Sequence, residues 1–169
     1  ARGRRIRGRE AWALLTADLL EAAAAVRPDP TLDDHIRSVR VQRTLRRQLR
    51  ARGLVAFLAD GSVLPRRSGV DPRPLDGAVP LQAPDTLAVT LDTGAGPIRG
   101  LGVPEGVTVL VGGGFHGKST VLQAIQRGHL DHVPGDGRER VVTRDDAVKI
   151  RAEDGRRVAG VDISPFLGT

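Results

Sequence analysis

The sequence predicts a mixed fold of the α+β or α/β class, in which a small helical and hairpin region precedes a strand–loop–helix unit. Three observations lead to this prediction. Two segments with helical periodicity lie in the first third of the chain, short apolar runs bounded by glycine and proline follow them, and a glycine-rich loop precedes a further helical segment. The length of 169 residues suits one domain, or one small domain joined to part of another.

Composition favours a folded chain without disulfides. Hydrophobic residues make up 40% of the sequence, which is enough for a packed core, although 21 Gly and 11 Pro imply many turns. The absence of Cys excludes disulfides and thiolate metal sites. No apolar run approaches the roughly 20 residues that span a bilayer, and acidic residues interrupt the apolar segment after the basic N-terminus. We therefore expect a soluble, cytoplasmic protein with no membrane partner.

The net charge of +6 comes almost entirely from arginine, since only Lys118 and Lys149 are lysines. Codon bias in a GC-rich genome explains this usage, and selection for a nucleic-acid surface is the alternative. Residues 1–10 are especially rich in arginine. They form either a solvated terminus or an arm that binds phosphates.

Two helices are predicted before the first strand. One runs from Glu10 to Arg27, where apolar residues recur at helical steps and prolines follow. The other runs from Thr31, a suitable N-cap, to about Arg52, and ends at Gly53.

The second predicted helix has an apolar face and a nearly opposite basic face. These faces hold Val41, Leu45 and Leu49 on one side, and Arg40, Arg43, Arg47 and Arg50 on the other. A core-facing side and a solvated side are the common arrangement, but an arginine stripe of this length can also follow the phosphates of a nucleic acid. Aromatic residues are scarce, which argues against stacking on single-stranded bases.

Residues 54–65, LVAFLADGSVLP, predict a β-hairpin because two apolar runs flank Asp60-Gly61. Residues 65–85 are rich in Pro, Gly and Asp and predict a connection. We place a domain boundary near residue 85, which divides the chain into a helical and hairpin region, 1–85, and a second unit, 86–169.

The second unit begins with strands predicted over 86–91 and 98–103. Residues 105–111, EGVTVLV, predict a short buried strand that leads into the glycine-rich loop. Residues 118–127 predict the helix that follows, ended by Gly128. Strand, loop and helix in this order are the context that a phosphate-binding loop requires.

The loop carries the full phosphate-binding pattern, Gly112-x-x-x-x-Gly117-Lys118-Ser119. Glycines let backbone N–H groups approach phosphate oxygens because no Cβ intervenes, and the helix N-terminus adds unpaired N–H groups. Lys118 can reach the β- and γ-phosphates, and the Ser119 hydroxyl can bind Mg²⁺. The candidate nucleotide-binding residues are Gly112, Gly113, Gly114, Phe115, His116, Gly117, Lys118, Ser119 and Thr120, and Ser119 is the candidate metal ligand.

Four segments resemble the predicted ATPases of the ABC class: VAFLADGSVLPRRSGV, GVPEGVTVLVGGGFHGKSTVLQAIQRG, DHVPGDGRERVVT and VKIRAEDGRRVAGVDISPF. Phe115 and His116 match the aromatic residue and the His of that family's phosphate loop. The resemblance covers roughly residues 35–169 and is most specific over 112–140. It implies an ABC-type P-loop domain with an antiparallel β-subdomain before a parallel α/β core. It also implies ATP, Mg²⁺ and sites completed between two copies in a head-to-tail dimer.

The groups that an ABC-type site needs for hydrolysis are not found after the phosphate loop. No apolar run there ends in Asp-Glu, Asp145-Asp146 precedes the apolar residues next to it, and no Ser-Gly-Gly-like signature or metal-contacting Gln is found. Residues 86–111 contain no aromatic residue that could stack on adenine. We therefore expect the N-terminal and early-core portion of a longer ATPase, able to bind nucleotide without efficient turnover by itself.

Other candidate sites are weaker. A metal site is disfavoured because the spacing of His129, Asp131, His132, Asp136 and Glu139 matches no strong pattern. The loop over 134–139 either brings Arg138 to a phosphate or a partner, or is a turn held by Asp136. Asp154-Gly155 predicts a hairpin turn between strands over 147–151 and 158–163. His116 either contacts the γ-phosphate or only fills its turn.

Three functions stay open. The first is Mg²⁺-dependent ATP binding and hydrolysis by an ABC-class ATPase. The second is an RNA- or DNA-binding protein that uses its arginine-rich N-terminal region and is switched by nucleotide. The third is a P-loop domain that serves another reaction, such as that of a kinase, and the strand layout ahead of the loop disfavours it.

Overall fold

The computed structural model describes residues 7–26, 30–150 and Gly160. The chain divides into two compact units, residues 1–37 and residues 38–169. The described elements are helices and one four-stranded antiparallel sheet, which confirms the predicted mixture of α and β structure.

Residues Gly8–Ala25 of the first unit form a helix of three consecutive pieces. These are α1 (Gly8–Ala13), a π-helical turn η1 (Leu14–Asp18) and α2 (Leu19–Ala25). At the junction, the Thr16 hydroxyl donates to the Trp12 carbonyl across 2.7 Å, a local bond that competes with the helical ladder. The predicted helix is confirmed, but its described side chains are all exposed, including Trp12 at 70%.

Helix α3 (Leu32–Ala51) confirms the second predicted helix, and Gly53 follows it with a φ of +63°. Its apolar face is confirmed, since Leu45 and Leu49 are fully buried and Val41 packs against them. The four arginines of the opposite face are exposed.

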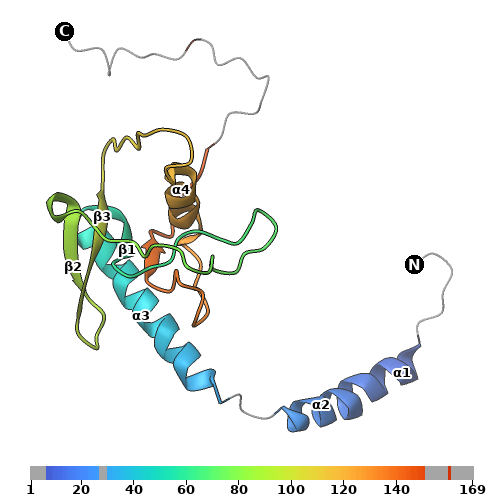
Figure 1. Ribbon diagram of the computed structural model, residues 1–169. Coiled ribbons are helices and arrows are strands. Elements are labelled where there is room, and N and C mark those ends of the chain that lie inside the picture. Colours follow the sequence, from blue (N-terminus) through green and yellow to red (C-terminus); the bar gives the residue numbers. More distant parts are fainter. Residues whose placement is uncertain (1–6, 27–29, 151–159, 161–169) are drawn as a thin grey trace. The chain divides into compact units, whose positions relative to one another are not determined.

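The sheet has the strand order β2-β3-β1-β4, and all its pairs are antiparallel (Figure 1). Its strands are β1 (Leu54–Ala59), β2 (Ala88–Asp92), β3 (Pro97–Pro104) and β4 (Val141–Thr143). Strands β2 and β3 confirm the predicted pair over 86–103. Strand β4 was not predicted, and its β-branched Val-Val-Thr run was the only local signal for it.

The core lies on both faces of β1. One face packs against α3 through Phe57 and Ala59, and the other packs against α4 (Lys118–Arg127) through Ala56 and Leu58. The register shifts between Leu54 and Ala56, so one extra residue is accommodated there. This bulge brings Leu54 to the face of Phe57, where both join the cluster with Leu45 and Leu49.

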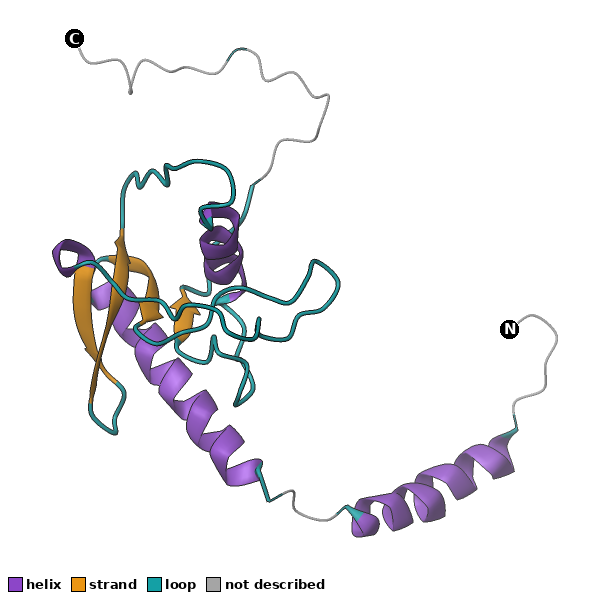
Figure 2. Cartoon of the chain, viewed as in Figure 1, coloured by secondary structure: helices purple, strands orange, loops and turns teal. Residues whose placement is uncertain are grey.

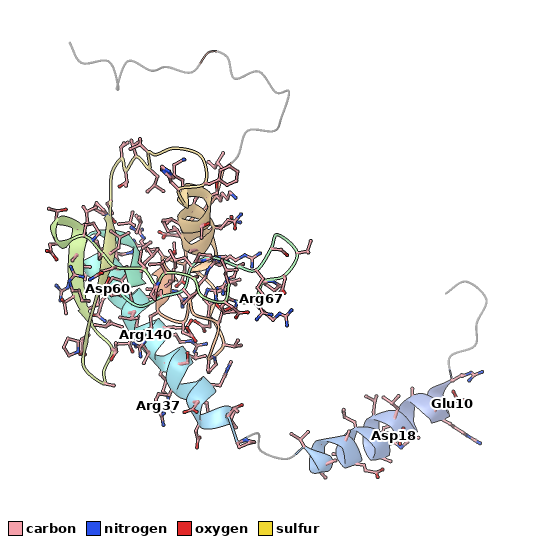
Figure 3. All side chains as sticks on the ribbon, viewed as in Figure 1. Glu10, Asp18, Arg37, Asp60, Arg67 and Arg140 are labelled. Carbon is pink, nitrogen blue, oxygen red and sulfur yellow. The ribbon has the colours of Figure 1, made fainter. Side chains whose placement is uncertain are left out.

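The hairpin predicted over 54–65 is wrong. The Asp60-Gly61 turn exists, with a φ of +83° at Gly61, but residues 62–65 do not return as a strand. Both edges of β1 are already paired, with β3 and β4, so no edge is left for an adjacent return strand. Asp60, labelled in Figure 3, instead holds the following connection, because its carboxylate accepts from the Ala83 N–H across 2.6 Å and from Arg99.

The connection predicted over 65–85 is confirmed in large part. It contains one isolated bridge, Arg66 with Pro74, and ends at the 3₁₀ turn η2 (Asp85–Leu87). The boundary expected near residue 85 falls inside the second unit, because β1 from before it pairs with β3 from after it.

The buried strand predicted over 105–111 does not form within the described residues. The segment has no strand pairing among the described residues, and its side chains are exposed. An apolar run becomes a strand only when neighbouring strands accept its backbone bonds, and no described strand lies in register beside it. Residues 147–150 likewise form no strand, while the rest of the hairpin predicted around Asp154-Gly155 lies outside the described residues.

Candidate functional site

The glycine-rich loop joins the exposed segment after β3 to helix α4 (Figure 2). Gly112 has a φ of +148° and Gly117 a φ of +78°. These are backbone conformations that L side chains rarely adopt, so the first and last glycines of the pattern are required by geometry. Phe115 has a φ of +61° and is the one non-glycine residue with positive φ in the described chain.

Helix α4 confirms the helix predicted over 118–127, and its N-terminus faces the loop. Gly117 is the N-cap and supplies no side-chain hydrogen bond. The first helical bond runs from the Val121 N–H to the Gly117 carbonyl across 2.9 Å. The N–H groups of Lys118, Ser119 and Thr120 therefore have no acceptor within the helix, and they lie at the positive end of its dipole. This is the arrangement that binds anions.

Lys118 extends from the first turn of α4 back over the loop. Its ammonium donates to the Gly112 carbonyl across 2.6 Å and to the Gly113 carbonyl. Both acceptors are neutral and the group is only half-buried. A charged phosphate oxygen is a stronger acceptor than either carbonyl, so it can displace them.

His116 packs against the backbone of its own loop. A Cβ added at Gly113 would lie 3.1 Å from the imidazole Cε1, closer than ordinary van der Waals contact. Gly113 therefore lets the ring lie close to the chain. Phe115 is fully exposed, Ser119 is exposed and Thr120 is half-buried.

The far end of α4 is held by β4 and α3. Thr143 of β4 donates its hydroxyl to the Ile125 carbonyl across 2.6 Å, and its N–H donates to Gly128 across 2.9 Å. Arg46 of α3 donates to the carbonyls of Gly128 and Leu130 at 3.1 and 3.2 Å. Sequence reasoning missed Arg46, because nothing local distinguishes it from the other arginines of its helix.

Asp131 and Asp136, two of the residues considered as metal ligands, are engaged by cationic side chains. Asp131 forms ion pairs with Arg43 and Arg46, at 3.3 and 3.1 Å. Asp136 pairs with Arg66 across 2.9 Å and with His132 across 2.7 Å. Within the residues that the structure describes, no group of three or more His, Asp or Glu side chains is placed to hold a metal.

Arg138 is 1% exposed, and it donates through Nε to the Leu64 carbonyl across 3.0 Å. Burial, and then the charge of Arg66, lower the pKa of this guanidinium to about 10. Asp136 is held by Arg66 and His132 rather than by its own turn. Burial raises the pKa of the Asp136 carboxyl, but the hydrogen bond from His132 and the charge of Arg66 outweigh this effect and keep that pKa below its ordinary value.

Comparison with known proteins identifies the family. Residues 28–169 match the family model ABC_ATPase, described as a P-loop domain. The chain belongs to the ABC_ATPase family. It is also 32% identical over 150 residues to the uncharacterized protein MJ1628 of Methanocaldococcus jannaschii. That alignment covers 83% of this chain and 33% of the relative, so the chain spans about a third of the length of the curated relative it matches.

Membership of the ABC_ATPase family agrees with the resemblance carried by the loop and its flanking segments, and at family level it supports nucleotide binding. The geometry of the loop is consistent with that chemistry, since an uncapped helix N-terminus and a lysine ammonium meet at the glycines. None of the described helices is long and apolar enough to span a membrane.

Proposed function

We propose that residues 112–120 bind the phosphates of ATP together with Mg²⁺. The observation that carries this proposal is the set of N–H groups without a helical acceptor at the start of α4, together with the Lys118 ammonium that lies against the loop carbonyls. Backbone donors and a mobile positive charge at one point suit a polyphosphate, which presents several negative oxygens within a few ångströms.

Each candidate residue has a proposed role that fits its place. Gly112 and Gly117 provide the turn, and Gly113 and Gly114 leave the backbone N–H groups uncovered. Lys118 exchanges its two loop carbonyls for β- and γ-phosphate oxygens. The Ser119 hydroxyl, exposed on the first turn of α4, is a ligand for Mg²⁺, and Thr120 donates to an α- or β-phosphate oxygen. Bound Mg²⁺ would neutralise charge on the β- and γ-phosphates.

Hydrolysis needs groups beyond these. Within the described residues, no carboxylate forms a hydrogen bond or ion pair with residues 112–120. We propose that the water-positioning carboxylates belong to other parts of a longer protein, consistent with the chain matching 33% of its relative. We also propose that a second copy, arranged head to tail, completes each site in that protein.

The test is ATP binding by the full-length protein, measured by isothermal titration calorimetry with Mg²⁺. Lys118→Ala should abolish ATP binding at the phosphate loop, because it removes the only charged side chain that reaches the loop among the described residues. Arg52→Ala is the matched control, since it removes a positive charge from an exposed position. Unchanged ATP affinity in the Lys118→Ala protein would contradict the assignment of residues 112–120 as the phosphate-binding site.

A second proposed function is nucleotide-switched binding of RNA or DNA by α3. The observation that favours it is the exposed arginine stripe, defined as Arg40, Arg43, Arg47 and Arg50. Arg43 and Arg50 are paired with Asp131 and Asp146. Arg40 and Arg47 make no side-chain hydrogen bond or ion pair within the described chain, so two charges are available for phosphates.

The stripe is tested with a fluorescent oligonucleotide over a range of salt concentrations. Binding should weaken steeply as salt rises, and the double variant Arg40→Glu, Arg47→Glu should remove it. Absence of binding at low salt would exclude this function.

A further inference from the structure

A second basic site lies along α4, away from the phosphate loop. It is a pocket of about 420 Å³, and its charged or amide side chains are Arg66, Arg127, Arg138, Lys149, Gln123 and Gln126. Ser68, Gly69, Val70 and Pro72 complete its wall, and Arg67, labelled in Figure 3, precedes them in the chain. Arg127 follows Lys118 by nine residues, which is about 13 Å along the helix. The pocket therefore opens near the C-terminal end of α4, whereas the phosphate loop lies at its N-terminal end.

The pocket has four cations and little to neutralise them. Arg66 is paired with Asp136, and Lys149 donates to the Gln126 side chain across 2.8 Å. Arg127 makes no side-chain hydrogen bond or ion pair with any described residue. No acidic or aromatic residue lines the pocket. A site with these walls recognises negative charge rather than a base or an apolar group.

Arg138 forms the buried end of the pocket. Its Nε and one terminal nitrogen both donate to the single carbonyl of Leu64. Its other terminal nitrogen makes no hydrogen bond to the described residues and keeps some accessible surface, although the side chain as a whole is 1% exposed. Burying a cation is costly, and the one carboxylate that acts on Arg138, Asp136, is already paired with Arg66 and His132. An anion in the pocket would supply a further acceptor and further negative charge.

We propose that this pocket binds a small, multiply charged phosphate anion, with Arg127, Arg138 and Lys149 as its ligands. Several cations that converge in a pocket of this volume suit a group such as pyrophosphate. The same chemistry is presented by free polyphosphate and by the phosphate tail of a nucleotide. A phosphodiester strand carries one charge per phosphate and suits an open surface such as the α3 stripe better than this pocket.

The test is calorimetric titration of pyrophosphate into the full-length Lys118→Ala protein, in which the phosphate loop is disabled. We expect saturable binding of one anion per chain. Arg127→Gln and Lys149→Gln should each weaken it at least about tenfold, the effect of losing one charged hydrogen bond. Both side chains are exposed, so these variants keep the fold. Arg52→Gln, outside the pocket, is the control that leaves the affinity unchanged.

Absence of saturable binding, or equal affinity in all these variants, would overturn the proposal. A parallel titration with ATP separates the two sources: ATP binding that Arg127→Gln weakens identifies a nucleotide tail, and pyrophosphate binding alone identifies a free polyphosphate. Binding of only a single-stranded oligonucleotide would also overturn it. ATP binding by the phosphate loop is measured in the wild-type protein, in which Lys118 is intact. A failure of pyrophosphate to bind the Lys118→Ala protein would therefore not count against the phosphate loop.

Discussion

Arg46 shows how much a single side chain contributes to the placement of α4. It is one-tenth exposed, pairs with Asp131, and donates to backbone carbonyls at the end of α4 and in β4. Arg46→Lys keeps the charge but loses the planar fork that makes these bonds together. We expect the free energy of unfolding to fall by about 2 kcal/mol, measured by urea denaturation. Arg47 is exposed and unpaired in the described chain, so Arg47→Lys should change the free energy of unfolding little. An equal loss of stability in the two variants would contradict the role of Arg46 in holding α4.

Ser119 offers a second test at the same scale, and it rests on the proposed ATP site. Removing its hydroxyl with Ser119→Ala should weaken ATP binding in Mg²⁺ by at least about tenfold, because one metal ligand is lost. In EDTA the variant and the wild type should bind ATP alike. A loss of the same size without Mg²⁺ would place the hydroxyl on a phosphate and not on the metal.

Prediction from sequence at the residue level reaches only features that are local in the chain. The glycine pattern and Lys118 are adjacent in the chain, so their geometry follows from one turn and one helix start. The bond from Arg46 to Gly128, which is 82 residues away, depends on the folded path of the chain. Spacing in the sequence carries no information about that path.

At the scale of elements, the close pairing of β1 and β3 depends on glycine. A Cβ at Gly100 would lie 2.7 Å from the Ala59 Cα, inside any real contact distance. Gly100→Ala should therefore lower the free energy of unfolding by about 1–3 kcal/mol, the usual cost of overpacking. Gly69→Ala is the control, because its Cβ would meet no atom within 4 Å. If thermal melts showed the Gly100→Ala protein to be as stable as the Gly69→Ala protein, β1 and β3 would be able to move apart at Gly100 without a loss of stability.

Helices were easier to predict than strands for a physical reason. The periodicity of α3 and α4 records contacts within each helix and one buried face, both visible along the chain. A strand exists only with its partners. The apolar runs after Gly61 and after Pro104 looked equally strand-like, yet β1 pairs with the more distant β3 and β4 instead.

At the scale of the whole molecule, the segment before the phosphate loop is the clearest sign of further structure. Val107, Val109 and Val111 are all exposed, although alternating β-branched residues suit a paired strand. They lead directly into the loop that holds Lys118. An exposed apolar run at the entrance of a binding loop leaves that loop less constrained than one that follows a paired strand.

We propose that, in the longer protein, further strands pair with residues 105–111 and fix the loop. Hydrogen exchange should then be at least about 100-fold slower at these amides in the full-length protein than in the 169-residue chain, because paired amides exchange only when the strand opens. Strand β4, already paired with β1, is the internal control and should be protected in both. Equal exchange over 105–111 in the two proteins would mean that no strand covers the segment, and that the loop binds phosphate without a fixed strand behind it.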